Sequence, residues 1–397
     1  MHPNVPHLRF PEFHGEWCVS TIGEQFDLYS GNTPSRLNKE HFEGNVNWIT
    51  SGELKEHYIS DTKEKISEDA ATANNLKLLH PGTFVIAIYG LEADGVRGTG
   101  SITCKESTIS QACMAFTQKG DVKNEFLYSW YKKHGNIIGI KYAQGTKQQN
   151  LSYDILEKFH IAYPSQDEQD KLIKFISLLD ERIASQSKLI EDLKKLKSAI
   201  IDYAINSLDS GFVKFGSLYE MAGEGGTPTT SNASFYDNGN IPFIKIDDLK
   251  QKYLTENKDF ITELGLQKSS AWLVPTHSIL FSNGATIGEI SITTYPVCTK
   301  QGILGIVPKQ NIDVEFLYYF MSSSYFKKAV RRIVTEGTMK TAYLKDINNI
   351  LCPIPTKEKQ QEIAKMPSTL NSKIDFEQSI LKLFCSQKQY LLRQMFI

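Results

Sequence analysis

Two stretches of this sequence resemble one another closely, and they decide its fold. "YPSQDEQDKLIKFISLLDERI" occupies residues 163–183, and "IPTKEKQQEIAKMPSTLNSKI" occupies residues 354–374. The two align without a gap, so that Gln169 falls opposite Gln360, 191 residues later. The chain therefore contains an internal repeat, and both copies have the composition of an amphipathic helix.

Both copies continue as long helices with apolar side chains at alternating spacings of four and three residues. This period of 3.5 residues is the a/d pattern of a coiled coil. Polar residues interrupt both seams at matching places, Gln186 with Glu377 and Lys197 with Lys388. We expect the two helices to pair antiparallel, because the chain must return after an intervening globular domain. The apolar seam positions are Leu172, Ile176, Leu179, Ile183 and Leu193 in the first copy, and Ile363, Leu370, Ile374, Leu381 and Leu391 in the second.

The two helices are predicted to begin and continue differently. Ser165 can cap the first helix, and Glu168 completes the spacing of a capping box. In the second copy Lys359 stands at the position of Glu168, so the box is lost. Pro367 lies within the second helix, where proline removes a hydrogen bond and clashes with the preceding turn. A kink or break near Met366 is therefore predicted.

The repeat extends into the segments before each helix. "GNTP" at residues 31–34 matches "GGTP" at 225–228, and "NEFLYSWY" at 124–131 resembles "VEFLYYFM" at 314–321. Short apolar runs among Gly, Pro, Asn and Thr predict strands and turns. "EFLYSWYKK" and "EFLYYFMSSSYFKKAVRR" predict short helices, which makes each globular segment α+β.

The predicted fold is α+β, with two similar globular domains separated by two long antiparallel helices. The helices form a coiled-coil spacer, and the whole chain is a pseudo-twofold internal repeat. The expected boundaries are 1–160 for the first globular domain, 161–209 for the first spacer helix, 210–353 for the second globular domain and 354–397 for the second spacer helix.

Composition limits the class of protein. The 397 residues exceed one typical domain, and the formal net charge is −1, so any nucleic-acid contact must rest on local basic patches. No apolar run approaches the length of a membrane span, and the N-terminus has no signal pattern, which favours the cytoplasm. The six cysteines contain no CxxC pair, so neither a disulfide framework nor a zinc site is indicated.

Catalytic motifs are missing from the sequence. It contains no GxxxxGK[ST] phosphate loop, no GxSxG elbow, no HExxH pair and no Asn-Pro-Pro-aromatic run of the kind expected in DNA adenine methyltransferases. "GVRGTG" at residues 95–100 favours a turn over a dinucleotide site, and Asp247 with Asp248 favours a solvated turn over a metal site. We therefore predict no catalytic residue and no metal ligand in this chain.

Basic residues gather at the same place in both copies, within residues 130–147 and 325–345. Either window could be a solvated helix face, but the matched pair favours phosphate contact, with polar side chains reading base edges. "NGATIG" at residues 283–288 is either an ordinary turn or a further loop that approaches DNA. The predicted DNA-binding residues are Lys132, Lys133, Lys141, Thr146, Lys147 and Gln148 in the first copy, and Asn283, Thr286, Lys327, Arg331, Thr338 and Lys340 in the second.

The duplicated order of these elements resembles the specificity subunit of type I restriction–modification systems. Two divergent globular segments alternate with two similar helices that begin Pro-[Ser/Thr]-x-x-x-Gln, and a GxTP element opens each segment. The resemblance implies that each globular domain is a target recognition domain, which reads one half of a bipartite, asymmetric site in double-stranded DNA. It implies that the helices set the spacing between the half-sites.

The resemblance also implies the partners. Two methyltransferase (modification) subunits would dock on the helices and bring S-adenosylmethionine, and restriction subunits would bring ATP and Mg²⁺. This chain itself would hold no cofactor, catalyse no reaction and contact no membrane.

Two other classes of function remain open from the residues alone. One is a DNA-modifying enzyme with an unrecognised site, which would require cofactor-dependent activity from this chain alone. The other is a non-catalytic assembly scaffold built on the coiled coil, which would bind partners without sequence-dependent affinity for DNA.

Overall fold

The computed structural model describes residues 4–93, 95–145, 149–284, 286–334 and 340–397. Two long helices, α5 (Gln166–Asn206) and α10 (Lys357–Met395), belong partly to each of two compact units. The predicted domain boundaries instead separate each helix from its globular segment, and that division remains a prediction. Unit 1 comprises residues 1–186 and 380–397, and unit 2 comprises residues 187–379.

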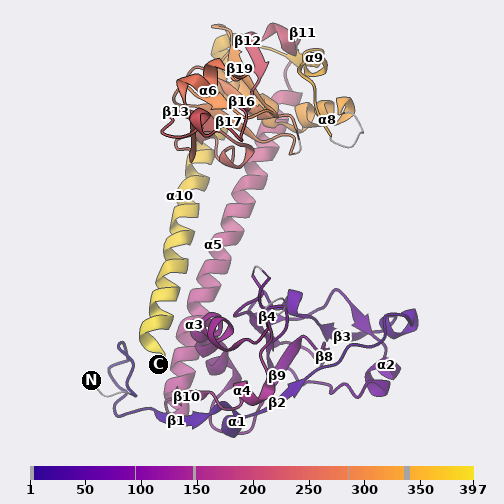
Figure 1. Ribbon diagram of the computed structural model, residues 1–397, viewed down its shortest axis with the longest axis vertical. Helices are drawn as coiled ribbons and strands as arrows, with labels where there is room; N and C mark the ends of the chain where they lie inside the picture. The colour runs from indigo at the N-terminus through magenta and orange to yellow at the C-terminus, as the bar shows by residue number, and fades with distance from the viewer. Residues whose placement is uncertain (1–3, 94, 146–148, 285, 335–339) are drawn as a thin grey trace. The chain divides into compact units, whose positions relative to one another are not determined.

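The globular part of unit 1 contains a five-stranded sheet in the order β2-β9-β6-β7-β4 and a three-stranded sheet in the order β5-β3-β8 (Figure 1). In the large sheet all neighbours are antiparallel except β4 and β7. A further antiparallel pair, β1 with β10, leads into α5. The strands are β1 (Cys18–Thr21), β2 (Phe26–Ser30), β3 (Val46–Ile49), β4 (Tyr58–Ile59), β5 (Lys65–Ile66), β6 (Phe84–Ala87), β7 (Gly100–Thr103), β8 (Ser107–Ile109), β9 (Cys113–Gln118) and β10 (His160–Tyr163).

Unit 2 repeats this topology strand for strand. Its large sheet has the order β12-β19-β16-β17-β14, its small sheet has the order β15-β13-β18, and β11 pairs with β20 before α10. The sequence repeat is therefore a structural repeat. The strands are β11 (Phe212–Lys214), β12 (Tyr219–Glu224), β13 (Ile241–Ile244), β14 (Tyr253–Leu254), β15 (Asp259–Ile261), β16 (Ile279–Ser282), β17 (Ile290–Thr293), β18 (Cys298–Thr299), β19 (Ile303–Pro308) and β20 (Leu351–Pro353).

The helix that packs on the large sheet differs between the copies. In unit 1 it is the continuous α3 (Asn124–Tyr142), which is longer than the short helix that the sequence predicts. In unit 2 it is divided into α7 (Val314–Ser322) and α8 (Ser324–Ile333). Ser323 makes the division, because its hydroxyl accepts a hydrogen bond from the backbone N–H of Phe326 at 3.2 Å and so caps α8.

The GxTP element marks a close approach of two backbones in each unit. A side chain at Gly31 would collide with the carbonyl of Ile109, and one at Gly225 would collide with the carbonyl of Thr299. Ile109 ends β8 and Thr299 ends β18, the equivalent strands of the two small sheets. Glycine is therefore required at this point of both copies, because it has no Cβ.

The repeated glutamine of the long helices is a buried connector. Gln169 donates from Nε2 to the carbonyls of Asp121 and Pro164 at 3.1 and 3.0 Å, and its Oε1 accepts from the backbone N–H of Lys123 at 3.0 Å. Gln360 makes the same three kinds of bond in unit 2, to Asn311, Pro355 and Asp313. Each glutamine thus fixes the start of its long helix to the loop that precedes α3 or α7.

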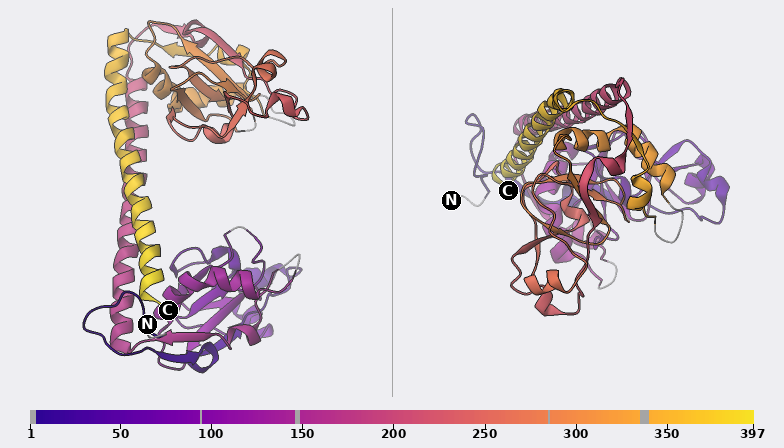
Figure 2. Two further views of the ribbon diagram at one scale, coloured as in Figure 1. Left: turned by 60° about the vertical axis from the view of Figure 1, so that its left-hand side comes forward. Right: turned by 90° about the horizontal axis from the view of Figure 1, so that it is seen from above.

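The seam of the long helices is confirmed by its burial. All ten predicted apolar seam positions are buried or half-buried, whereas most of their neighbours are exposed. Within unit 1 the first half of α5 lies beside the last half of α10 (Figure 2), where Arg182 stacks on Phe384 at 4.5 Å and Lys388 pairs with Asp180. Residue numbers rise along one helix as they fall along the other, so the pair is antiparallel as predicted.

The predicted break in the second helix is wrong. α10 runs without interruption from Lys357 to Met395, with Pro367 inside it. Pro367 is buried, and Ile363 and Ala364 in the preceding turn pack against the core of unit 2. This packing offsets the roughly 3 kcal/mol that a proline costs inside a helix.

The start of α5 differs from the predicted capping box. The carboxylate of Glu168 is held by the guanidinium of Arg9, with contacts of 2.8 and 2.7 Å, and it accepts from Trp17 at 3.4 Å. Glu168 therefore serves the N-terminal segment rather than the capping box that the sequence predicts. Thr356, the matching cap of α10, accepts from the backbone N–H of Lys359 at 3.5 Å.

Candidate nucleic-acid interface

In both units, the residue that follows the loop predicted to read DNA makes an equivalent backbone hydrogen bond. The N–H of Leu151 donates to the carbonyl of Ile88 at 2.8 Å, and the N–H of Ala342 donates to the carbonyl of Asn283 at 2.9 Å. Ile88 directly follows β6 and Asn283 directly follows β16. Each loop thus returns from the helix on the large sheet to the end of a central strand of that sheet.

Part of the prediction falls outside the residues that the structure describes. Thr146, Lys147 and Gln148 of the first loop and Thr338 of the second lie in those segments, and their DNA contacts remain predictions. The base of the first loop is described: Gln144 and Asn150 exchange two backbone hydrogen bonds of 2.8 and 2.9 Å.

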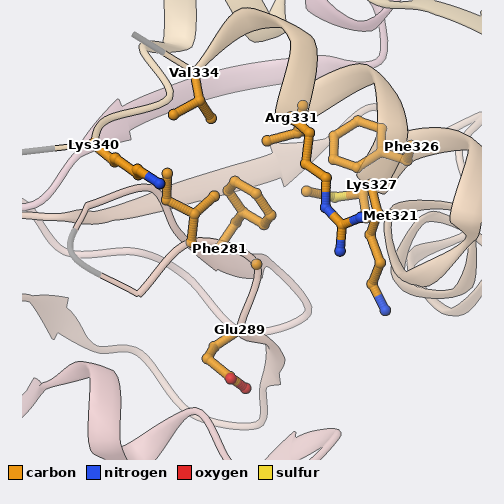
Figure 3. A pocket seen from close by; sticks show the side chains of 11 residues that line it. Phe281, Glu289, Met321, Phe326, Lys327, Arg331, Val334 and Lys340 are labelled. Carbon is orange, nitrogen blue, oxygen red and sulfur yellow. The ribbon is translucent and has the colours of Figure 1, made fainter. Parts of the chain in front are cut away.

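Unit 2 brings three of the predicted DNA-binding residues to one depression of about 590 Å³. Figure 3 shows Lys340 on one side of it and Arg331 with Lys327 on the other, with Phe281 between them. All three basic side chains belong to exposed residues. The floor is apolar and is made by Phe281, Ile287, Met321, Phe326, Val330 and Val334.

Such a surface can hold a nucleic-acid backbone. Three cations against one carboxylate on the rim, that of Glu289, give the depression a net positive character. Lysine and arginine bind phosphate oxygens, and arginine also donates to guanine in the major groove. An apolar floor below such a rim can contact a sugar or a thymine methyl group.

Two lysines of the basic window of unit 1 lie in a different environment. The amino group of Lys133 donates to the carbonyl of Phe396 at 2.6 Å, beyond the end of α10. Lys132 places its amino group 5.0 Å from the centre of the Tyr128 ring, and burial together with Lys388 lowers its pKa to about 8. Predicted DNA contact by Lys132 and Lys133 does not fit this geometry, because both face α10 of their own unit.

Of the remaining predicted DNA-binding residues, two are exposed and one is buried. Lys141, in the last turn of α3, and Thr286 are exposed and free to meet a ligand. Asn283 is buried, and its Nδ2 donates to the carbonyl of Ala342 at 3.3 Å. Asn283 therefore anchors the loop, and DNA contact by its side chain does not fit.

Sequence reasoning missed Arg97. The turn predicted for residues 95–100 is present, with φ values of 75° at Gly95 and 73° at Gly98. Within it the Arg97 guanidinium donates to the Oε1 of Gln149 at 2.8 Å, next to the predicted DNA-reading residues. Its stem packs against Gly139 of α3. The signal was an arginine between two glycines, which is too common to single out without the fold.

Each unit also places a basic side chain between its globular part and its long helix, which the sequence did not indicate. In unit 1 the ring of His57 lies between Tyr58 and Tyr128, with Nε2 at 2.9 Å from Glu125 and Nδ1 at 3.7 Å from Asp180 of α5. Burial acts to lower the pKa of His57, but the two carboxylates outweigh it and the pKa is raised.

Unit 2 has a lysine in the place of this histidine. Lys252 is buried, pairs with Glu315 of α7, and donates to Tyr319 at 2.9 Å and to Ser368 of α10 at 3.1 Å. The two basic residues precede the equivalent strands β4 and β14, and their acids Glu125 and Glu315 occupy matching places in "NEFLYSWY" and "VEFLYYFM". Both units thus connect globular part to long helix through a basic side chain, which is half-buried in unit 1 and buried in unit 2.

Across the described residues, no group of three His, Cys, Asp or Glu side chains is arranged to hold a metal ion. The six cysteines are free thiols. In the same described part of the chain, no helix is long and apolar enough to cross a membrane.

The family that matches this chain is described as the type I restriction modification DNA specificity domain, which matches residues 14–195 and again residues 208–383. The chain belongs to this family. The two matches coincide with the two copies of the repeat. The family predicted from the duplicated motifs is confirmed, and with it the role of a specificity subunit.

Relatives of known name agree over most of the chain. The specificity subunit of the type I restriction enzyme MjaIX of Methanocaldococcus jannaschii is 24% identical over 385 residues, which cover 90% of this chain and 88% of that protein. The EcoR124I/EcoR124II specificity subunit of Escherichia coli is 26% identical over 61% of this chain and 62% of its own length.

The fold recurs in solved structures. The S subunit of a type I restriction–modification system from Mycoplasma genitalium superposes with a TM-score of 0.56, with 19% identity and 99% of each chain covered. A chain from a study of complex assembly and conformational transition of the type I system has a TM-score of 0.61, with 14% identity, and covers 95% of this chain and 96% of that one. The predicted architecture of two α+β domains and two long helices is confirmed.

Proposed function

We propose that this chain selects the DNA sequence for a type I restriction–modification complex, with each globular domain reading one half of a bipartite, asymmetric site. The observation that carries the proposal is the structural repeat, because one chain holds two globular domains of the same topology and divergent sequence. The basic depression of unit 2, with Lys327, Arg331 and Lys340 on its rim, supports that role.

The long helices set the distance between the two half-sites and dock two methyltransferase subunits. Exposed apolar side chains at seven-residue spacing support such docking, because this spacing places them on one face of each helix. They are Leu189, Leu196 and Tyr203 on α5 and Phe376, Leu383 and Tyr390 on α10.

The chemistry belongs to the partners in this proposal. S-adenosylmethionine is held by the methyltransferase subunits and ATP with Mg²⁺ by the restriction subunits, while this chain is a non-catalytic DNA-binding subunit that works in the cytoplasm. The scattered histidines and cysteines, and the missing catalytic motifs, support this division of labour.

A methylome tests the proposal. The chain is expressed with its neighbouring methyltransferase subunit in a host without DNA methylation, and modified adenines are mapped by single-molecule sequencing. We expect a bipartite motif with a fixed unspecified gap that is lost when this chain is omitted. Methylation that is unchanged without this chain, with the methyltransferase competent, would contradict the proposal and favour the scaffold.

A further inference from the structure

A groove between the long helices is open in unit 2 and filled in unit 1. In unit 2 it has a volume of about 410 Å³ and is lined by Ile200 and Tyr203 of α5 and by Glu362, Ile363 and Met366 of α10. Tyr203 and Met366 are 77% and 57% exposed, far more than apolar side chains within a closed seam.

The repeat identifies the equivalent groove of unit 1. An offset of 191 residues carries Tyr203 to Gln394, Glu362 to Lys171 and Met366 to Phe175. The N-terminal segment of the chain occupies this position. The N–H of Leu8 donates to the carbonyl of Gln394 at 2.9 Å, and the ring of Phe10 meets the ring of Phe175 edge-on at 5.7 Å.

Charges hold this N-terminal segment in place. Arg9 pairs with Glu168, and Glu12 pairs with Lys171, whose amino group also lies 4.6 Å from the centre of the Phe10 ring. The aromatic anchor, Phe10, thus has a basic residue before it that pairs with an acid of α5. It has an acidic residue after it that pairs with a base of α5.

Unit 2 cannot fill its own groove in this way with its described residues. In unit 1 the segment Leu8–Phe13 precedes β1 and contains a turn, in which the N–H of Phe13 donates to the carbonyl of Phe10 at 3.1 Å. In unit 2 the chain reaches β11 directly from the end of α5, through residues 207–211. The positions that correspond to Leu8–Phe13 are therefore used by α5 itself.

The charges of the open groove are reversed. Lys359 stands in the place of Glu168, and Glu362 stands in the place of Lys171. In the described structure these two pair with one another at 2.9 Å. The N-terminal segment of a second copy would place Arg9 against Lys359 and Glu12 against Glu362, so two like-charge contacts oppose that occupant.

We propose that the open groove of unit 2 binds a segment of the methyltransferase subunit that carries an aromatic anchor with an acidic residue before it and a basic residue after it. This inference rests on the proposed function, because that function makes the methyltransferase the partner of the long helices. Met366, in the place of Phe175, suits an aromatic ring, since thioethers pack favourably against aromatic side chains.

Two fluorescent peptides test the groove on the full chain. One is the N-terminal segment itself, HLRFPEFHGEW (residues 7–17), and the other carries Arg9→Glu and Glu12→Lys. By anisotropy we expect the charge-swapped peptide to bind about tenfold more tightly than the natural one. The protein variant with Lys359→Glu and Glu362→Lys should reverse that preference, because it restores the charges of unit 1.

Point variants locate the binding. Met366→Lys, at an exposed position, should abolish binding of the swapped peptide, whereas Gln378→Lys, exposed on α10 but outside the groove, should leave it unchanged. A saturating amount of the methyltransferase subunit should displace the swapped peptide from the unmodified chain.

Each of the following results would contradict the inference. Equal binding of the two peptides, or no binding up to about 1 mM, would remove the groove as a site. Preference for the natural peptide would make a second copy of this chain the occupant. A swapped peptide that stays bound beside a co-eluting methyltransferase would remove that partner from the groove. The methylome tests the proposed function separately, because it reads DNA selection and not peptide binding.

Discussion

The amino group of Lys197 on α5 donates a hydrogen bond of 2.8 Å to the Oδ1 of Asn371 on α10. An offset of 191 residues converts this contact into that of Lys388 with Asp180, which is present in unit 1. In each unit, the seam lysine of one long helix therefore contacts a side chain at the equivalent position of the other long helix. A polar residue inside a coiled-coil seam fixes register at some cost in stability, and both units use the same one.

Removing the lysine of unit 1 should cost more than removing the lysine of unit 2. Lys388→Ala leaves the half-buried carboxylate of Asp180 without its lysine partner, and we expect a loss of about 2–3 kcal/mol in the free energy of unfolding of unit 1. Lys197→Ala leaves a neutral amide, so we expect a loss of about 1 kcal/mol in unit 2.

Urea denaturation measures both effects, with Lys382→Ala as the exposed control on α10. Equal losses for the two variants, or a loss for the control of the same size, would show that the seam lysines have no specific role.

Removing a glutamine connector should lower the free energy of unfolding by more than removing a seam lysine. Gln169→Leu keeps the volume of the side chain but leaves the buried carbonyl of Pro164, the part-buried carbonyl of Asp121 and the N–H of Lys123 without their partner, which should destabilise unit 1 by about 2–4 kcal/mol. Gln360→Leu should act likewise on unit 2. Gln166→Leu, exposed in the first turn of α5, is the matched control. Hydrogen exchange of the first turn of each long helix should rise in the connector variants alone.

His57 predicts a pH dependence that is confined to unit 1. Its pKa is raised above the ordinary value of 6.5, because Asp180 and Glu125 outweigh burial. The stabilisation is therefore complete below about pH 6.5 and is lost as the pH rises through the folded-state pKa. The charged and titratable groups around the ring are Glu125 and Tyr128 of α3, Tyr58 of β4, Asp180 of α5 and, through Asp180, Lys388 of α10.

A variant with the lysine of unit 2 separates this cause from others. His57→Lys keeps a positive charge at all pH values near neutrality, as Lys252 does in unit 2. NMR titration of the imidazole should give a pKa above 6.5, and the unfolding midpoint of unit 1 should fall as the pH rises through that pKa in the natural chain only. A pKa at or below the ordinary value would contradict the arrangement of charges around the ring.

The basic rim predicts a salt-dependent loss of DNA binding. Arg331→Ala and Lys340→Ala should each reduce the slope of log affinity against log salt concentration by about 1, because each removes one phosphate contact. Lys250→Ala, on the acidic loop of unit 2 beside Asp247 and Asp248, should leave the slope unchanged. Lys147→Ala should have the corresponding effect on the first half-site. Titrations at several salt concentrations measure the slopes, and unchanged slopes in all the basic-rim variants would remove the depression from the interface.

The sequence predicted well what depends on pattern. The seam, its polar interruptions and the antiparallel pairing follow from spacing along the helix, and the seam side chains are buried as expected. The repeat predicted that both globular domains share one topology. What the pattern could not supply is the direction of single side chains, since Lys132 and Lys133 lie in a basic window but face α10.

Tertiary packing explains the other differences. A proline breaks an isolated helix, but Pro367 lies in a helix whose preceding turn packs on the core of unit 2. Glu168 has the spacing of a capping box, yet Arg9, 159 residues away in sequence, binds its carboxylate. Arg97 and His57 gain their roles only from partners far along the chain, which a single sequence does not reveal.

The most direct test of the account is a chain that carries the same reader twice. Residues 211–354 are replaced by a second copy of residues 18–163, which preserves the junctions of β11 and β20 with the long helices. Its methylome, measured with the methyltransferase subunit, should show a symmetric motif whose two halves are inverted copies of one half of the natural site. A motif that is unchanged by the replacement, or changed in both halves, would contradict the claim that each globular domain reads its own half-site.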